Sequence, residues 1–304
     1  VKRFVENMFE KSMKKCYFIK GILSQMKVRK ILGYKNGGKY MQQPRMLSAK
    51  EIANEVVEVG KYKVSRKNSV VIISGMLAGL FIALGYTVYL LVYGQMENHF
   101  VGKLIGAFLF PVALILILLT GADLFTGNTL IGKAYFKKEV KLSAFIKNLA
   151  LVWIGNLLGT LLGVALLTGA HLFTNGVGPG VADSIRHIAE VKINTLSTSE
   201  VFFRAILCNI LIAGGVYVAY AAKDVAGKCI LNIIVVAVFA IMGVEHCIAN
   251  MFVLSMAKVL GADISYAGMG WNIFIATIGN IIGGFVIVVP YYYNFIHSYK
   301  NRQH

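Results

Sequence analysis

The chain contains few of the residues that usually cover the surface of a soluble protein. Only 15% of its 304 residues are charged, and 14 Asp and Glu stand against 31 Lys and Arg. Apolar residues make up 57%, and the mean hydropathy is +0.66. An ordinary soluble domain of this length carries a larger polar fraction. The composition therefore excludes that class and indicates an integral membrane protein.

Cysteine and proline are scarce as well. None of the four prolines stands in an Asn-Pro-Ala box, which argues against a water or glycerol pore of aquaporin type. The four cysteines have neither the pairing of an extracellular disulfide scaffold nor a metal-ligand spacing. They are Cys16, Cys208, Cys229 and Cys247. We therefore expect no metal and no other cofactor, and we expect no nucleic-acid partner.

Long apolar runs fill most of the sequence after residue 68. A helix needs roughly 20 apolar residues to cross about 30 Å of hydrocarbon. Six runs reach that length, at residues 69–93, 104–130, 144–169, 201–222, 229–257 and 268–296. The sequence thus predicts an all-α polytopic membrane protein, with a six-span domain over residues 68–298.

Lysines gather in the connections that follow the second and fourth runs. They are Lys133, Lys137, Lys138, Lys141 and Lys147 in the former, and Lys223 and Lys228 in the latter. Cytoplasmic loops carry an excess of Lys and Arg. We therefore expect both connections and both termini to be cytoplasmic, in a bacterial inner membrane.

The segment before the first run differs in kind. Residues 1–45 carry 12 Lys and Arg against two Glu. They are either a polybasic segment attracted to anionic lipid, at about 1 kcal/mol per cation, or a disordered extension, assigned here to residues 1–46. Residues 47–67 place apolar and charged residues at helical spacing, which predicts an interfacial amphipathic helix. Residues 299–304 are expected to be a cytoplasmic tail.

A polar motif occurs twice inside the apolar runs. Residues 121–128 read Gly-Ala-Asp-Leu-Phe-Thr-Gly-Asn, and residues 243–250 read Gly-Val-Glu-His-Cys-Ile-Ala-Asn. A second echo follows each copy: Ile-Gly-Asn-Leu-Leu-Gly at 154–159 and Ile-Gly-Asn-Ile-Ile-Gly at 278–283. The chain therefore consists of two related halves of three spans each, and an odd span number makes the repeat an inverted one.

Glycines around the polar motifs predict that the second and fifth spans are broken helices. Such breaks expose backbone NH groups and positive dipole ends, which suit an anion and are tolerated only inside a protein or beside a cavity. Asp123 and Glu245 are expected to accept hydrogen bonds from these NH groups, because a bare carboxylate would repel an anion. The same scaffold is expected to use Asn128, Asn209 and Asn250.

His246 lies well inside an apolar run, unlike the other five histidines. It either ties two helices together as a neutral side chain or lines a pore and hydrogen-bonds or protonates a passing anion. The duplicated motif favours the pore, and Thr126 is expected to present its hydroxyl opposite His246. Apolar constrictions are predicted at Phe110, Leu114, Leu124, Phe125 and Phe239.

At these residues the chain resembles the formate/nitrite transporter family. The resemblance covers roughly residues 47–296 and rests on Asp-Leu-Phe-Thr-Gly-Asn at 123–128 and Glu-His-Cys-Ile-Ala-Asn-Met-Phe at 245–252. It implies an aquaporin-like fold and a homopentamer in the lipid bilayer, with one pore per protomer for small monovalent anions. It also implies that Lys192 is the family's lysine in the external loop.

The first motif copy looks more like the hydrosulfide-channel branch of that family, so hydrosulfide is the expected substrate and formate or nitrite the alternative. The anion would pass either charged or after protonation near His246. A non-transporting membrane scaffold is a further alternative. A hydrolase or metalloenzyme is not expected, because adjacent residues such as Glu245 and His246 point about 100° apart on a helix.

Overall fold

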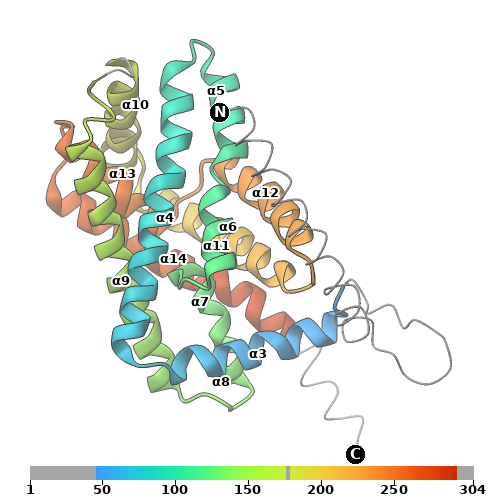
Figure 1. The fold of residues 1–304 in the computed structure, drawn as a ribbon. Coiled ribbons are helices and arrows are strands. Elements are labelled where there is room, and N and C mark those ends of the chain that lie inside the picture. Colours follow the sequence, from blue (N-terminus) through green and yellow to red (C-terminus); the bar gives the residue numbers. More distant parts are fainter. Residues whose placement is uncertain (1–45, 176–178, 293–304) are drawn as a thin grey trace, which may run out of the picture. The chain divides into compact units, whose positions relative to one another are not determined.

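The computed structural model describes residues 46–175 and 179–292, and the predictions for residues 1–45 and 299–304 lie outside this part (Figure 1). The described chain is helical, as predicted. Its elements are α3 (Ala49–Ser65), α4 (Asn68–Gln95), α5 (His99–Leu109), α6 (Val112–Thr120), α7 (Phe125–Asn128), η1 (Thr129–Ile131), α8 (Gly132–Phe136), α9 (Leu142–Gly169), α10 (Pro179–Glu190), η2 (Val191–Thr195), α11 (Thr198–Ala219), α12 (Val225–Met242), α13 (Cys247–Val259) and α14 (Tyr266–Tyr292).

Six described segments are long and apolar enough to cross a membrane. They are Asn68–Gln95, His99–Thr120, Leu142–Gly169, Thr198–Ala219, Val225–Met242 and Tyr266–Pro290. The second of these comprises α5 and α6, which meet at Pro111. Each predicted apolar run corresponds to one of these spans, so the six-span prediction is confirmed.

The two halves pack their long helices in the same way. Helix α4 lies against α9 in the first half, and α11 lies against α14 in the second. Glycines permit the close approach: a Cβ atom on Gly159 would lie 1.9 Å from the Met76 carbonyl oxygen, and one on Gly283 would lie 2.3 Å from that of Ile206. The small residues of both echoes therefore bring helix backbones together within each half.

Both predicted helix breaks are present, and a glycine ends the helix at each. Helix α6 is capped by Gly121 at φ 74°, and α12 is capped by Gly243 at φ 63°. This left-handed conformation costs a residue with a Cβ atom about 1 kcal/mol or more, which explains the glycine. The chain then runs extended and re-enters helix at Phe125 and at Cys247. The first break is short, since α7 already begins at Phe125.

The connection between the two halves contains regular structure. It includes helix α10, which is followed by the π-helical turn η2. Helix α10 packs against α4 and α13, and η2 carries Lys192. The connection therefore helps to build the interior.

Candidate functional site

The two motif copies meet at one hydrogen bond. Thr126 Oγ1 of α7 lies 3.1 Å from His246 Nε2, and both side chains are buried. The other ring nitrogen, Nδ1, accepts the backbone NH of Ala249 at 3.1 Å and so caps α13. A neutral imidazole that accepts at Nδ1 carries its hydrogen on Nε2. His246 therefore donates to the Thr126 oxygen, which leaves the threonine hydrogen available to another acceptor.

Three cavities lie beside this contact; His246 lines two of them, and Thr126 lines none of the three. The Lys192 vestibule, of about 300 Å³, has Lys192, Glu245 and His246 in its lining. The central chamber, of about 10 Å³, shares Phe110, Phe239 and His246 with the vestibule. The Lys63 pocket, of about 40 Å³, shares Leu114 and Leu124 with the chamber. The shared residues are the walls between successive cavities, so the three cavities lie in a row along one path that these walls interrupt.

Four of the five predicted constriction residues stand at those walls. The rings of Phe110 and Phe239 stack with centroids 5.8 Å apart on the vestibule side of the chamber. Leu114 and Leu124 close its other side. Phe125 lines none of the three cavities and is buried as the first residue of α7. Its role as a constriction stays a prediction.

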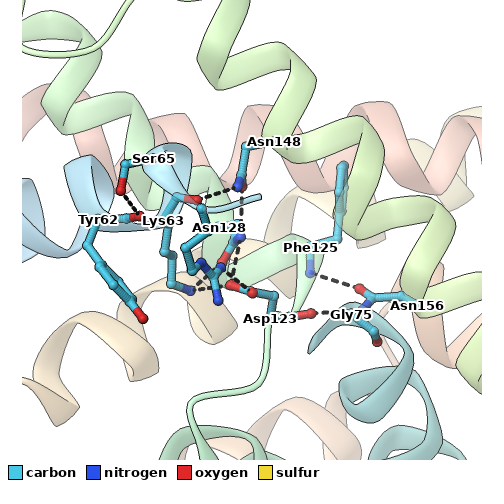
Figure 2. Close-up of polar contacts among 10 residues, drawn as sticks. Tyr62, Lys63, Ser65, Gly75, Asp123, Phe125, Asn128, Asn148 and Asn156 are labelled. Atoms are coloured by element: carbon cyan, nitrogen blue, oxygen red, sulfur yellow. Dashed lines mark hydrogen bonds and ion pairs between the residues drawn. The ribbon is translucent and has the colours of Figure 1, made fainter. Parts of the chain in front are cut away.

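The Lys63 cluster consists of Lys63, Arg66, Asp123, Asn128 and Asn148 (Figure 2). Lys63 Nζ lies 3.1 Å from Asp123 Oδ1, and the Arg66 guanidinium pairs with the other carboxylate oxygen. Asn128 donates to Asp123 at 3.2 Å and to Asn148 at 3.0 Å. Asn148 in turn donates to the Lys63 carbonyl at 3.1 Å, which ties α9 to the end of α3.

The Lys192 cluster repeats these bonds in the second half. It consists of Lys192, Glu245, Asn250 and Asn272. Lys192 Nζ lies 2.6 Å from Glu245 Oε1, and the lysine side chain is 12% exposed. Asn250 donates to Glu245 at 2.6 Å and to Asn272 at 2.8 Å, and Asn272 donates to the Lys192 carbonyl at 3.3 Å. The lysine implied by the family resemblance is thus part of a buried ion pair at the helix break.

One asparagine holds the extended segment of each break. Asn156 accepts the NH of Phe125 at 2.9 Å and donates to the carbonyls of Gly75 and Asp123 at 2.8 Å (Figure 2). Asn280 accepts the NH of Cys247 at 2.9 Å and donates to the Ala205 and Glu245 carbonyls. The freed NH groups therefore bond to amides. Our expectation that the Asp123 and Glu245 carboxylates accept them was wrong, because each carboxylate is occupied by a cation and an asparagine.

Asn209 belongs to the same scaffold, as predicted from the sequence. Its amide donates to the Thr126 carbonyl at 3.3 Å and to the Asn280 carbonyl at 2.6 Å. It therefore links the two breaks across the interface between the halves. Four site residues were not identified from the sequence: Lys63, Arg66, Asn148 and Asn272. The duplicated motif could have pointed to Lys63. Asp123 and Glu245 occupy matching positions, so a lysine partner for one implies a cation partner for the other.

The comparisons with known proteins agree with this architecture. The family model described as formate/nitrite transporter matches residues 50–294. The chain belongs to the formate/nitrite transporter family. Proteins of this family are channels and transporters, so the chain is a membrane transport protein and not an enzyme.

Individual family members match over most of their length. The uncharacterized transporter YrhG of Bacillus subtilis (strain 168) is 34% identical over 255 residues, which cover 83% of this chain and 94% of YrhG. The formate channel BtFdhC of Bacillus thuringiensis is 32% identical over 77% of this chain and 90% of its own length. A solved pentameric formate channel with formate bound has a TM-score of 0.66 at 27% identity, over 74% of this chain and 96% of that one.

These family members bear on the expected subgroup. Two of these three relatives are formate channels, and the comparisons give no support to the hydrosulfide branch that the first motif copy suggested. Residues 121–128 belong to the break scaffold shared by both halves. A short motif that serves the scaffold says little about substrate, which explains why it misdirected the subgroup prediction.

Proposed function

We propose that the chain conducts small monovalent anions, with formate as the leading substrate, through a separate pore in each protomer of a homopentamer. The contact between Thr126 and His246, placed between two apolar walls, carries this proposal. The formate channel of B. thuringiensis and the pentameric structure with formate bound support formate and the pentamer.

The path suits an anion that sheds its water in stages. Cations at the vestibule attract it, and the Phe110 and Phe239 rings then force most of its water away. The chamber of about 10 Å³ is about the size of one water molecule, so a substrate enters it without its hydration shell. Dehydrating an anion is costly, and the Thr126 hydroxyl supplies the hydrogen bond that offsets part of the loss.

His246 acts in this proposal as a neutral hydrogen-bond donor. A second proton would have to enter at Nδ1, where the ring accepts the Ala249 NH and caps α13. Protonation therefore costs the cap as well as the desolvation of a charge. The substrate crosses either as the anion or as the neutral acid. In the second case it takes its proton before it reaches the chamber, so His246 stays neutral on both routes.

Hydrosulfide is the second candidate. Its single heavy atom fits the small chamber better than the three heavy atoms of formate. We further propose that the protein lies in a bacterial inner membrane, with the Lys63 pocket and both termini on the cytoplasmic side. The lysines that follow the second span, Lys137, Lys138 and Lys141, support this orientation, because they exceed the single Glu139 in that connection.

Stopped-flow flux into proteoliposomes tests the proposal. We expect formate to enter faster than nitrite, hydrosulfide or chloride. In His246→Asn the amide oxygen can still cap α13 and the amide NH can still donate, so formate flux and its pH dependence should persist in reduced form. Hydrosulfide flux without formate flux would reverse the order of the two candidates. No flux above empty liposomes, from verified pentamers, would favour the non-transporting scaffold.

A further inference from the structure

The Lys192 vestibule is much larger than the path it feeds. Its volume is about 300 Å³, whereas the chamber behind the Phe110 and Phe239 rings measures about 10 Å³. Sites for small organic ligands begin at about 300 Å³. Formate has three heavy atoms and leaves most of this space unused. The vestibule can therefore hold a molecule that the chamber cannot admit.

One wall of the vestibule is aromatic. Tyr86, Tyr89 and Tyr93 follow one another at helical spacing on α4 and line the cavity together. The ring centroids of Tyr86 and Tyr89 lie 5.6 Å apart, and the rings of Tyr89 and Tyr93 stack at 5.8 Å. None of the three hydroxyls has a hydrogen-bond partner in the described part of the chain. This wall offers ring surface and phenolic donors to a ligand.

The lining also supplies a positive charge that no carboxylate neutralises. Glu245 is the acidic residue in the lining, and it already pairs with Lys192 at 2.6 Å. Lys103 of α5 also lines the cavity and has no acidic partner within 4 Å among residues 46–175 and 179–292. Its Nζ lies 3.9 Å from the point where a Cβ atom on Gly243 would stand. The ammonium group therefore lies beside the helix break at Gly243, which also lines the vestibule.

We propose that the Lys192 vestibule binds aromatic monocarboxylates of about ten heavy atoms. The carboxylate pairs with Lys103, and the ring lies against Tyr86, Tyr89 and Tyr93. Such a ring does not fit the central chamber, so the bound molecule stops at the Phe110 and Phe239 rings and blocks the pore. The binding stands by itself, whereas the block rests on the proposed anion conduction.

Isothermal titration of the full-length solubilised protein with benzoate tests the binding. We expect saturable binding that weakens about tenfold in Lys103→Gln, since a hydrogen bond to a charged group is lost. Lys103→Arg should retain it. Lys141→Gln is the matched control, because Lys141 is an exposed lysine that lines none of the three cavities. Equal affinities of wild type and Lys103→Gln would overturn the proposal.

Two further titrations test the aromatic wall and the need for charge. Tyr93→Leu should weaken benzoate binding about threefold, because an aromatic contact is replaced by an aliphatic one. Neutral benzamide, which has the same ring, should bind much more weakly than benzoate. Benzamide binding as tight as that of benzoate would remove the role of Lys103 and with it the proposal.

Flux measurements test the block separately. Benzoate on the vestibule side should inhibit formate entry in proteoliposomes, while radiolabelled benzoate stays outside. Labelled benzoate that enters as fast as formate would contradict the block. Benzoate binding without any formate flux would keep the vestibule site and reject anion conduction, so the two proposals fail independently.

Discussion

In the Lys63 cluster the Asp123 carboxylate meets two cations, whereas in the Lys192 cluster the Glu245 carboxylate meets one. The first cluster therefore has a net charge of plus one and the second is neutral, when lysine and arginine are protonated. The additional cation is Arg66, which follows the last residue of α3. The two ends of the path differ in charge although they descend from one motif.

The hydrogen bonds around these charges hardly differ between the halves. Asn156 and Asn280 each bind one NH and two carbonyls at equivalent positions. Asn148 and Asn272 each donate a hydrogen bond to the backbone carbonyl of the cluster's lysine. The repeat thus preserves what a broken helix needs in a low-dielectric interior, where an unpaired backbone group costs several kcal/mol.

The contact at the chamber is where the halves diverge most. His246 stands where the first copy has Leu124, and Thr126 stands where the second copy has Ile248. Each copy contributes one polar side chain, and the two meet in a buried hydrogen bond beside the chamber that His246 lines. The comparison teaches that the repeat builds the scaffold, while the departures from it supply the proposed substrate contact.

The largest effect should come from removing a carboxylate. Asp123→Ala leaves two partly buried cations without their buried partner, and we expect it to destabilise the protein by roughly 3 to 5 kcal/mol. Glu245→Ala should cost less, because one cation loses its partner beside the open vestibule. Thermal unfolding in detergent measures both, with the exposed pair variant Asp183→Ala as the control. Equal losses for the two alanine variants would show that Arg66 does not matter.

Removing an asparagine at a break should cost the same in either half. Asn156→Ala and Asn280→Ala each lose three hydrogen bonds in a buried site, so we expect about 2 to 3 kcal/mol for each. Asn232→Ala, which loses one bond at a buried helix position, is the matched control and should cost less. Melting temperatures that differ by more than about 5 °C between the two break variants would contradict the symmetry.

Formate flux should depend on the hydroxyl at position 126 of the first half and not on the matching position 248 of the second half. Thr126→Val removes the hydroxyl at nearly constant volume, and formate flux should fall about tenfold through loss of one hydrogen bond to an anion. Ile248→Thr in the same background should not restore the flux, because it is Thr126 and not residue 248 that lies 3.1 Å from His246 Nε2. Stopped-flow flux of correctly folded variants decides the matter, and rescue by Ile248→Thr would speak against the asymmetry.

The smallest effect concerns the anchoring of α3 outside the spans. Lys61 lies 2.8 Å from Glu139, and its hydrogen bond holds the pKa of that carboxyl below the usual range, with help from Lys137. A lowered carboxyl pKa means that the pair stabilises the fold above the unfolded pKa of about 4.3 and loses this effect as pH falls through the lower folded value.

Glu139→Gln should therefore melt slightly below wild type at pH 7, by about 1 °C or less for such an exposed pair. The difference should vanish in acid, below the lowered pKa. A difference that grows as the pH falls would have the wrong sign for this ion pair. Differential scanning of both proteins over a pH series measures it.

Much of the fold was predictable because its signals are local. Runs of about 20 apolar residues predict spans, and a glycine such as Gly121 or Gly243 predicts the left-handed end of a helix. His246 and Thr126 were identifiable because a polar side chain inside an apolar run is costly in lipid and therefore marks a pore or a protein interior. The role of Phe125 as a constriction stays a prediction, because the sequence does not show which side chains at a helix break face the path.

The sequence by itself determined the membrane class, the two halves, the breaks and the polar residues of the motifs, since each depends on neighbours along the chain. Only the tertiary structure decided what those residues touch. Asp123 finds Lys63 and Arg66 some 60 residues earlier, and Thr126 finds His246 across 120 residues. Such partners are chosen by how helices cross and which carboxylates must be neutralised in a low-dielectric interior, and no local pattern encodes that choice.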